Sequence, residues 1–237
     1  MIERIDCKNL TYERFMKEFA DKKPVILTNL VNNWECFNWD LKYLNDRFGE
    51  QEVVIRKSDY EGKKKVYTVK LSKFIQLLEG GNEENWYCDW PFSIMGNREI
   101  ALSYSIPSFL TEQTVRKKGD KELKWVFLGS TNTGTPLHKD FQATHNWNAV
   151  IFGKKKWVFF NPEFNQEMEY LASVDCNIFN PTPEEQEIIL KAKPYYIELN
   201  QGEIIYTPKN WWHQVINEEL TFAISENFWF KHELQVN

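Results

Sequence analysis

Seven short segments follow one another from Lys124 onward, and this series constrains the fold more than any other feature. Each segment is apolar and rich in aromatic and β-branched residues, which favour strands. Turn residues separate the segments, and many short strands at this spacing predict a β-barrel or a β-sandwich. The segments are residues 124–130, 145–153, 155–161, 195–201, 202–208, 211–217 and 221–230.

One helix is predicted to interrupt this series. The residues Thr182-Pro183-Glu184-Glu185 have the capping-box pattern, with proline at the first helical position. The helix is expected to run through residues 184–193 and to end at Pro194. We therefore expect residues 124–230 to form the barrel core, with residues 161–194 as an insert in it.

Residues 1–123 are expected to form a layer of helices and strands beside the barrel. The helices are predicted at residues 11–19, with Thr11 as the N-cap, at residues 37–50, ending at Gly49, and at residues 72–79. A buried strand is expected within residues 23–31, and a hairpin at residues 52–60 and 64–72, around Glu61-Gly62. The sequence predicts one domain, residues 1–237, that is mainly β with flanking helices.

Charge and cysteine content narrow the classes of function. The formal net charge is −5 and the isoelectric point is about 5.6, whereas nucleic-acid binders usually have a basic surface. The four cysteines form no CxxC pair and the start of the chain has no signal-peptide pattern, so we expect reduced thiols. The apolar runs are too short to span a membrane. We expect a cytoplasmic protein, or a nuclear one if the organism is eukaryotic, with no DNA or membrane partner.

His138 and Asp140 are the first candidates for a chemical role. Alternate strand residues share a face, so these two side chains are expected on the same side. Two ligands rarely hold a metal, and His213, in a strong strand just after a turn, offers a third. Two histidines and one carboxylate form the facial triad of non-haem Fe(II) oxygenases. A chance HxD match and a satisfied core histidine would explain the same residues, so the hypothesis needs further support.

Lys155 gives that support. We predict a two-residue hairpin turn at Gly153-Lys154, which pairs the strands on either side of it. A lysine inside a barrel needs an anion, because an unpaired buried charge is very costly. No neighbouring strand offers an obvious carboxylate, so a bound anionic ligand would satisfy Lys155, unless the three consecutive lysines only solubilise a turn. The residues expected on one face are Asn148, Val150, Phe152, Lys155, Trp157 and Phe159.

These motifs together resemble the Jumonji-C (cupin-like) family of Fe(II)- and 2-oxoglutarate-dependent oxygenases. The resemblance is greatest to the small hydroxylase branch that includes the Jumonji-C lysyl hydroxylases. It implies that the barrel is a double-stranded β-helix, also called a cupin or jelly-roll barrel. The motifs that match in order and spacing lie at residues 23–34, 135–140, 146–157, 202–217 and 222–228.

The resemblance also implies roles for nine residues. His138, Asp140 and His213 would be the ligands of Fe(II). Lys155 would bind the distal carboxylate of the cosubstrate 2-oxoglutarate, and O₂ would be the other substrate. Tyr87 matches a cosubstrate-binding position but is equally explained as a core residue. The remaining matches to positions around the cosubstrate are Asn148, Thr135, Ser225 and Asn227.

The function implied is hydroxylation of a protein side chain, most simply a lysyl-type one, with release of succinate and CO₂. A protein or peptide would then be the substrate. Three alternatives stay open: hydroxylation of an RNA nucleoside or a small molecule, demethylation of N-methyl-lysine or N-methyl-arginine, and a non-enzymatic ligand-binding cupin. A methylated cation could contact an aromatic cluster, although tryptophans at strand spacing are more typical of a core. That cluster would be Trp86, Trp90, Trp211 and Trp212.

The end of the chain departs from the family's pattern in a way that bears on the oligomeric state. Some relatives carry a C-terminal helical bundle that is used for dimerisation. This chain stops at Asn237, soon after its last predicted strand. We therefore expect a monomer or a weak dimer.

Overall fold

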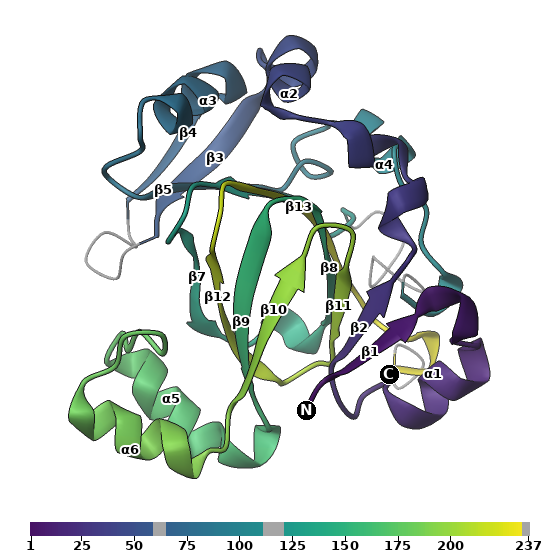
Figure 1. Ribbon diagram of the computed structural model, residues 1–237, viewed down its shortest axis with the longest axis vertical. Helices are drawn as coiled ribbons and strands as arrows, with labels where there is room; N and C mark the ends of the chain where they lie inside the picture. Colours follow the sequence, from purple (N-terminus) through teal and green to yellow (C-terminus); the bar gives the residue numbers. More distant parts are fainter. Residues whose placement is uncertain (59–64, 111–120, 234–237) are drawn as a thin grey trace.

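Two β-sheets form the centre of the computed structural model, which describes residues 1–58, 65–110 and 121–233 (Figure 1). The larger sheet has the order β1 (Glu3–Asp6), β2 (Val25–Thr28), β11 (Ile204–Thr207), β8 (His145–Phe152), β13 (Thr221–Phe228), β6 (Lys124–Gly129), β5 (Trp86–Trp90), β3 (Glu52–Lys57) and β4 (Val66–Lys70). The smaller sheet has the order β10 (Tyr195–Asn200), β9 (Lys154–Phe160), β12 (Trp212–Asn217) and β7 (Gly134–His138).

Side chains of both sheets pack into a shared apolar cluster. Val150 and Ile205 come from the larger sheet, and Trp157, Phe159 and Val215 come from the smaller one. Two sheets that enclose a common core in this way form the predicted jelly-roll barrel. The prediction of a mainly β protein with flanking helices is therefore confirmed, and all seven segments predicted after Lys124 contain strands.

The strands β8 and β9 do not form the predicted hairpin. β8 pairs with β11 and β13, whereas β9 pairs with β10 and β12. The chain passes from one sheet to the other at Gly153, whose φ is 85°. The hairpin prediction was wrong because a glycine turn between two apolar strands looks the same in sequence whether the strands pair or separate into facing sheets.

The N-terminal strands extend the larger sheet, and helices lie along them (Figure 1). β3 and β4 pair as predicted, while Glu61-Gly62 lies outside the described residues. Thr11 caps α1 by accepting a hydrogen bond from the backbone N–H of Arg14. The helices of this layer are α1 (Tyr12–Glu18), α2 (Leu41–Phe48), α3 (Leu71–Glu79) and α4 (Glu99–Leu102). The single-domain prediction and its boundary at residue 124 stay predictions.

The second predicted helix is shorter than expected. Residues 35–38 form a separate 3₁₀ turn, and α2 begins only after Asp40, whose carboxylate accepts a hydrogen bond from the N–H of Tyr43 at 2.7 Å. Gly49 follows the last residue of α2, as predicted, but its φ of −55° is not left-handed. No helix in the described part of the chain is both long enough and apolar enough to cross a membrane.

The insert contains two helices rather than the one predicted. The expected helix is α6 (Pro183–Lys191), and its capping box is present: Thr182 Oγ1 accepts from the N–H of Glu185, and the Glu185 carboxylate accepts from the N–H of Thr182. The additional helix is α5 (Asn165–Ser173). Both helices lie beside the smaller sheet at the end where β7 is located (Figure 1).

Candidate active site

All nine residues singled out in the sequence line one cavity of about 260 Å³. These residues come from six strands of the two sheets and from the segment that follows β7. Val215 and Phe127 add apolar wall to the same cavity. The nine are Tyr87 on β5, Thr135 and His138 on β7, Asp140 just after β7, Asn148 on β8, Lys155 on β9, His213 on β12, and Ser225 and Asn227 on β13.

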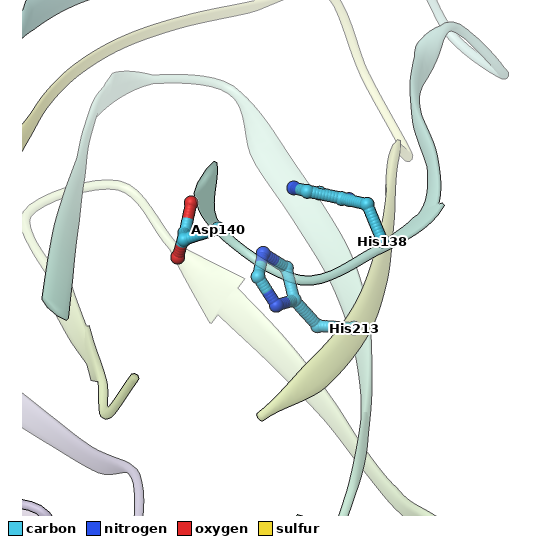
Figure 2. Close-up of side chains that lie close together, drawn as sticks. All are labelled: His138, Asp140 and His213. Carbon is cyan, nitrogen blue, oxygen red and sulfur yellow. The ribbon is translucent and has the colours of Figure 1, made fainter. Parts of the chain in front are cut away.

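His138, Asp140 and His213 converge at one side of this cavity (Figure 2). The antiparallel register of β7 and β12 sets His213 directly opposite His138, and the centres of their rings are 4.2 Å apart. Asp140 lies beyond the end of β7, where the chain turns back toward the two histidines. One potential ligand atom from each of the three residues lies within 4.8 Å of the others.

The two histidines are held in the form that binds metals. Nδ1 of His138 donates to the carbonyl oxygen of Pro136 at 2.7 Å, and Nδ1 of His213 donates to that of Trp211 at 3.0 Å. Nε2 of each ring therefore keeps its lone pair. Burial lowers the pKa of both rings to about 4, assisted at His138 by the other ring. Both rings are consequently neutral at pH 7.

The carboxylate completes a donor set that fits Fe(II). Burial raises the pKa of Asp140, while His138 and a hydrogen bond with Asn227 oppose that rise. Among the described residues, the buried Oδ2 atom of Asp140 has no hydrogen-bond partner. Leaving a buried oxygen unpaired is costly, and a cation at the point where the three side chains converge would satisfy it. Two imidazoles and a carboxylate on one face are the donor set that non-haem Fe(II) sites use.

Lys155 is buried in another part of the cavity, without a carboxylate partner in the described chain. Its exposed fraction is 1%, and its ammonium donates to Tyr87 Oη at 3.1 Å and to Asn217 Oδ1 at 2.9 Å. Burial, with the nearby positive charge of Arg56, lowers the pKa of Lys155 to about 7. An ammonium has three protons to donate, so one remains for an anion.

Sequence reasoning missed two residues that support this region, Arg56 and Asn217. Arg56 Nη2 donates to Thr135 Oγ1 at 3.0 Å, and the guanidinium carbon lies 5.0 Å from the centre of the Tyr87 ring. Arg56 is itself paired with Asp89, at 3.0 Å. Arg56 stands beside Lys57 in a segment with several charged residues, so the local sequence distinguished neither Arg56 nor Asn217.

The remaining polar residues of the cavity differ in how fully they are bonded. Asn146, also missed, donates to Ser225 Oγ at 2.7 Å and to Asn227 Oδ1 at 3.1 Å. Asn148 Oδ1, in contrast, is buried and has no partner among the described residues. Asn148 is therefore the member of this group that is free to bind a ligand. The four tryptophans considered as an aromatic cluster do not line the cavity.

A second group of potential ligands, Asp21, His145 and Glu233, is already occupied by contacts within the chain, two of them to a lysine. The ammonium of Lys209 lies 3.1 Å from Asp21 and 2.5 Å from Glu233. His145 bonds to Glu233 through Nε2 and to Tyr206 through Nδ1. These contacts explain the cluster as an internal ion-pair network, so it does not call for a metal.

Comparison with known proteins adds independent findings. The family model described as Cupin-like domain matches residues 12–235. The chain is 26% identical to Bifunctional arginine demethylase and lysyl-hydroxylase psr-1 of Caenorhabditis elegans, over 96% of this chain and 61% of that protein. It is 26% identical to Lysine-specific demethylase JMJ21 of Arabidopsis thaliana, over 93% of this chain and 25% of that protein.

A third relative is named for its cofactors. The chain is 22% identical to the 2-oxoglutarate and iron-dependent oxygenase JMJD4 homolog of Drosophila melanogaster, over 97% of this chain and 64% of that protein. The chain thus spans between 25% and 64% of the length of these three curated relatives.

Proposed function

Because the chain belongs to the cupin-like domain family, as its resemblance to the Jumonji-C enzymes led us to expect, we propose that it is an Fe(II)- and 2-oxoglutarate-dependent oxygenase. One observation carries this proposal. Within the described part of the chain, a single cavity contains two neutral histidines and an unpartnered carboxylate oxygen at one side, and a buried lysine without a carboxylate elsewhere. A cupin that only binds a ligand has no need for both.

His138, Asp140 and His213 would hold the iron through Nε2, a carboxylate oxygen and Nε2. Fe(II), when bound, supplies the activation of O₂, and the reaction would release succinate and CO₂. The protein contributes orientation and a dry site. The carbonyl oxygens of Pro136 and Trp211 fix the two rings in a metal-binding tautomer, as hydrogen bonds to ligating histidines generally do.

Lys155 would bind the distal carboxylate of 2-oxoglutarate through its remaining proton, in a charge-assisted hydrogen bond. Tyr87 and Asn217 hold the ammonium in place. Asn148 would donate to or accept from the cosubstrate, and Thr135, Ser225 and Asn227 would complete the polar wall. Trp157 and Val215 supply apolar wall that keeps water out.

We propose a protein side chain of the lysyl type as the substrate, in a cytoplasmic or nuclear compartment. The support is the name of the psr-1 relative, which includes lysyl-hydroxylase. The described cysteines are free thiols, three of them buried, which suits a reducing compartment.

Demethylation of N-methyl-arginine or N-methyl-lysine is the second candidate. The names of two of the relatives reported above include demethylase. The same site serves both reactions, because a hydroxylated N-methyl group breaks down to formaldehyde. The absence of Trp86, Trp90, Trp211 and Trp212 from the cavity wall removes the aromatic cluster that had favoured a methylated cation.

The test is succinate formation from 2-oxoglutarate by the protein purified without oxygen, supplied with Fe(II) and then with O₂. Peptides containing lysine, N-methyl-lysine or N-methyl-arginine are added one at a time. Turnover stimulated by a lysyl peptide that gains an oxygen atom supports hydroxylation, and formaldehyde release supports demethylation. An iron-loaded protein that forms no succinate under any condition would contradict the oxygenase proposal.

A further inference from the structure

Asn165, in the first turn of α5, joins the two segments that carry the proposed iron ligands. Its Oδ1 atom accepts from Lys139 Nζ at 2.8 Å and from Trp212 Nε1 at 3.0 Å. Lys139 stands between His138 and Asp140 in the chain, and Trp212 immediately precedes His213. A single oxygen atom of the insert is thus bonded to the residue next to each of the three ligands.

The orientation of the Asn165 amide is fixed by its other end. Nδ2 of Asn165 donates to the carboxylate of Glu169 at 2.8 Å, one turn further along α5. An amide nitrogen cannot accept from an ammonium or an indole N–H, so this arrangement is the only one that satisfies all three neighbours. Trp212 is 6% exposed, and its buried N–H would be costly to leave unbonded.

Lys139 adds an electrostatic reason for this network. Lys139 is one of the residues that line the cavity, where a free ammonium would repel a bound metal ion. The insert holds that ammonium in place. The nitrogen lies 3.6 Å from the Glu169 carboxylate and 4.9 Å from the centre of the Trp212 ring, in addition to its bond to Asn165.

Apolar packing fixes the position of the insert relative to the two strands, and so stabilises the hydrogen bonds of Asn165. Leu137 and Trp212, which flank the ligand positions on β7 and β12, share a buried cluster with Met168 and Leu171 of α5. Because α5 is packed against the outside of the same two strands, movement of Asn165 relative to them is restricted.

We propose that Asn165 is a positioning residue of the iron site, which sets the separation of the His138–Asp140 segment from His213 and holds Lys139 away from the metal. This inference rests on the proposed function, because it concerns the same site. It assigns the insert a role in metal binding, through residues that do not themselves touch the metal.

The experiment measures binding of Co(II), a stable substitute for Fe(II), to the whole chain without 2-oxoglutarate. Asn165→Ala is expected to weaken Co(II) binding by about tenfold, the lower end of the range for residues that support metal ligands. It should also change the visible absorption of the bound Co(II), which reports coordination geometry. Asn165→Asp keeps an oxygen that accepts from both partners and should restore affinity and spectrum.

Asn177→Ala is the matched control. Asn177 Oδ1 also accepts a hydrogen bond from β12, from Gln214 Nε2 at 2.9 Å, but it has no bond to the segment of His138 and Asp140. This variant should lose thermal stability to an extent similar to Asn165→Ala while binding Co(II) as the wild type does. If Asn165→Ala does not fold, Trp212→Phe tests the same network, because it keeps the apolar ring and removes the N–H.

The results that would overturn the inference are distinct from those that would overturn the proposed function. Wild-type affinity and spectrum in Asn165→Ala would overturn the inference, as would an equal loss of affinity in Asn177→Ala, because the insert would then contribute only stability. A wild-type chain that binds Co(II) no better than His138→Ala would overturn both.

Discussion

Lys155 is the residue whose charge state should decide how the site responds to pH. Burial lowers its pKa to about 7, from about 10.4 in an unfolded chain. Only the protonated ammonium can bind a carboxylate, so the affinity for 2-oxoglutarate should be greatest below pH 7. Above pH 7 the apparent dissociation constant should rise toward about tenfold per pH unit, since the competent fraction falls by that factor. Calorimetric titration of the iron-loaded, oxygen-free protein across this range measures the effect.

The same residue should influence stability in the opposite direction. Between pH 7 and about 10.4 the unfolded chain carries the proton and the ligand-free folded chain does not. The unfolded state therefore binds more protons, and this residue makes the free energy of unfolding rise with pH in that window.

Lys155→Met should remove that contribution and should also abolish tight binding of 2-oxoglutarate while leaving Co(II) affinity unchanged. A flat pH profile of cosubstrate affinity in the wild type would contradict the role of Lys155.

Residues of the site could be predicted where they lie within or close to a recognisable sequence motif. His138 and Asp140 are two residues apart and lie on one side of the cavity as expected, although Asp140 lies beyond the end of β7, so strand alternation alone does not account for its position. Arg56 on β3 and Asn217 on β12 bond to the cavity-lining residues Thr135 and Lys155, and only the tertiary pairing of distant strands brings them there. The local pattern around Arg56 predicted its strand and the pairing of that strand with β4, but not the contact of Arg56 with Thr135.

At the scale of the elements, the capping box of α6 offers a test of stability that is separate from the site. Thr182 Oγ1 accepts from the N–H of Glu185, and the Glu185 carboxylate accepts from the N–H of Thr182 at 2.7 Å. Thr182→Ala should lower the free energy of unfolding by about 1 kcal/mol, the usual cost of losing an N-cap side chain. Urea denaturation measures it. Thr182→Ser should stay close to the wild type, and an equal loss in both variants would show that the hydroxyl is not the cause.

The contrast between α5 and α6 shows which elements the sequence could predict. α6 has a threonine cap, a proline at its first position and a glutamate at its third. The residue at the N-cap of α5 is Phe164, whose side chain makes no capping hydrogen bond. A start signal lies further upstream, where Asn161 caps the 3₁₀ turn Pro162–Phe164 that leads directly into α5, and the prediction missed it. Tertiary packing also stabilises that helix, because its Met168 and Leu171 are fully buried.

At the scale of the whole molecule, one property of strands explains two outcomes. The prediction that β8 and β9 pair as a hairpin was wrong, yet Asn148 and Lys155 were correctly expected to face the interior. The side chains of Asn148 and Lys155 both line the cavity, because alternation along a strand does not depend on which strand is its partner. Pairing, however, depends on the path of the chain at Gly153, and in this barrel that path leads from one sheet to the opposite one. The sequence therefore predicted most of what faces the interior but not how the strands are connected. Phe152 is the exception, because it packs against the cluster that contains Ala149 and Ile151 rather than sharing the face of Val150.

Gly153 should for this reason be a position where a single methyl group disturbs the whole barrel. Its φ of 85° is unfavourable for any other residue, and a Cβ atom would lie 2.2 Å from the backbone oxygen of Leu220. Gly153→Ala should therefore cost about 2–5 kcal/mol, from the strained backbone conformation together with overpacking. Urea denaturation of the metal-free protein measures this as a lower midpoint.

Gly96 separates the two contributions. Its φ is 90°, close to that of Gly153, but no atom of the described residues would lie within 4 Å of a Cβ atom there. Gly96→Ala should thus carry only the backbone cost of about 1–2 kcal/mol. The two variants therefore differ in one contribution to the free energy of unfolding. That contribution comes from the contact between residue 153, where the chain crosses between the sheets, and Leu220, just before β13. Equal losses of stability in both variants would mean that the chain at residue 153 has room for a side chain. Only the left-handed backbone conformation of Gly153 would then be required for the two sheets to enclose the cavity.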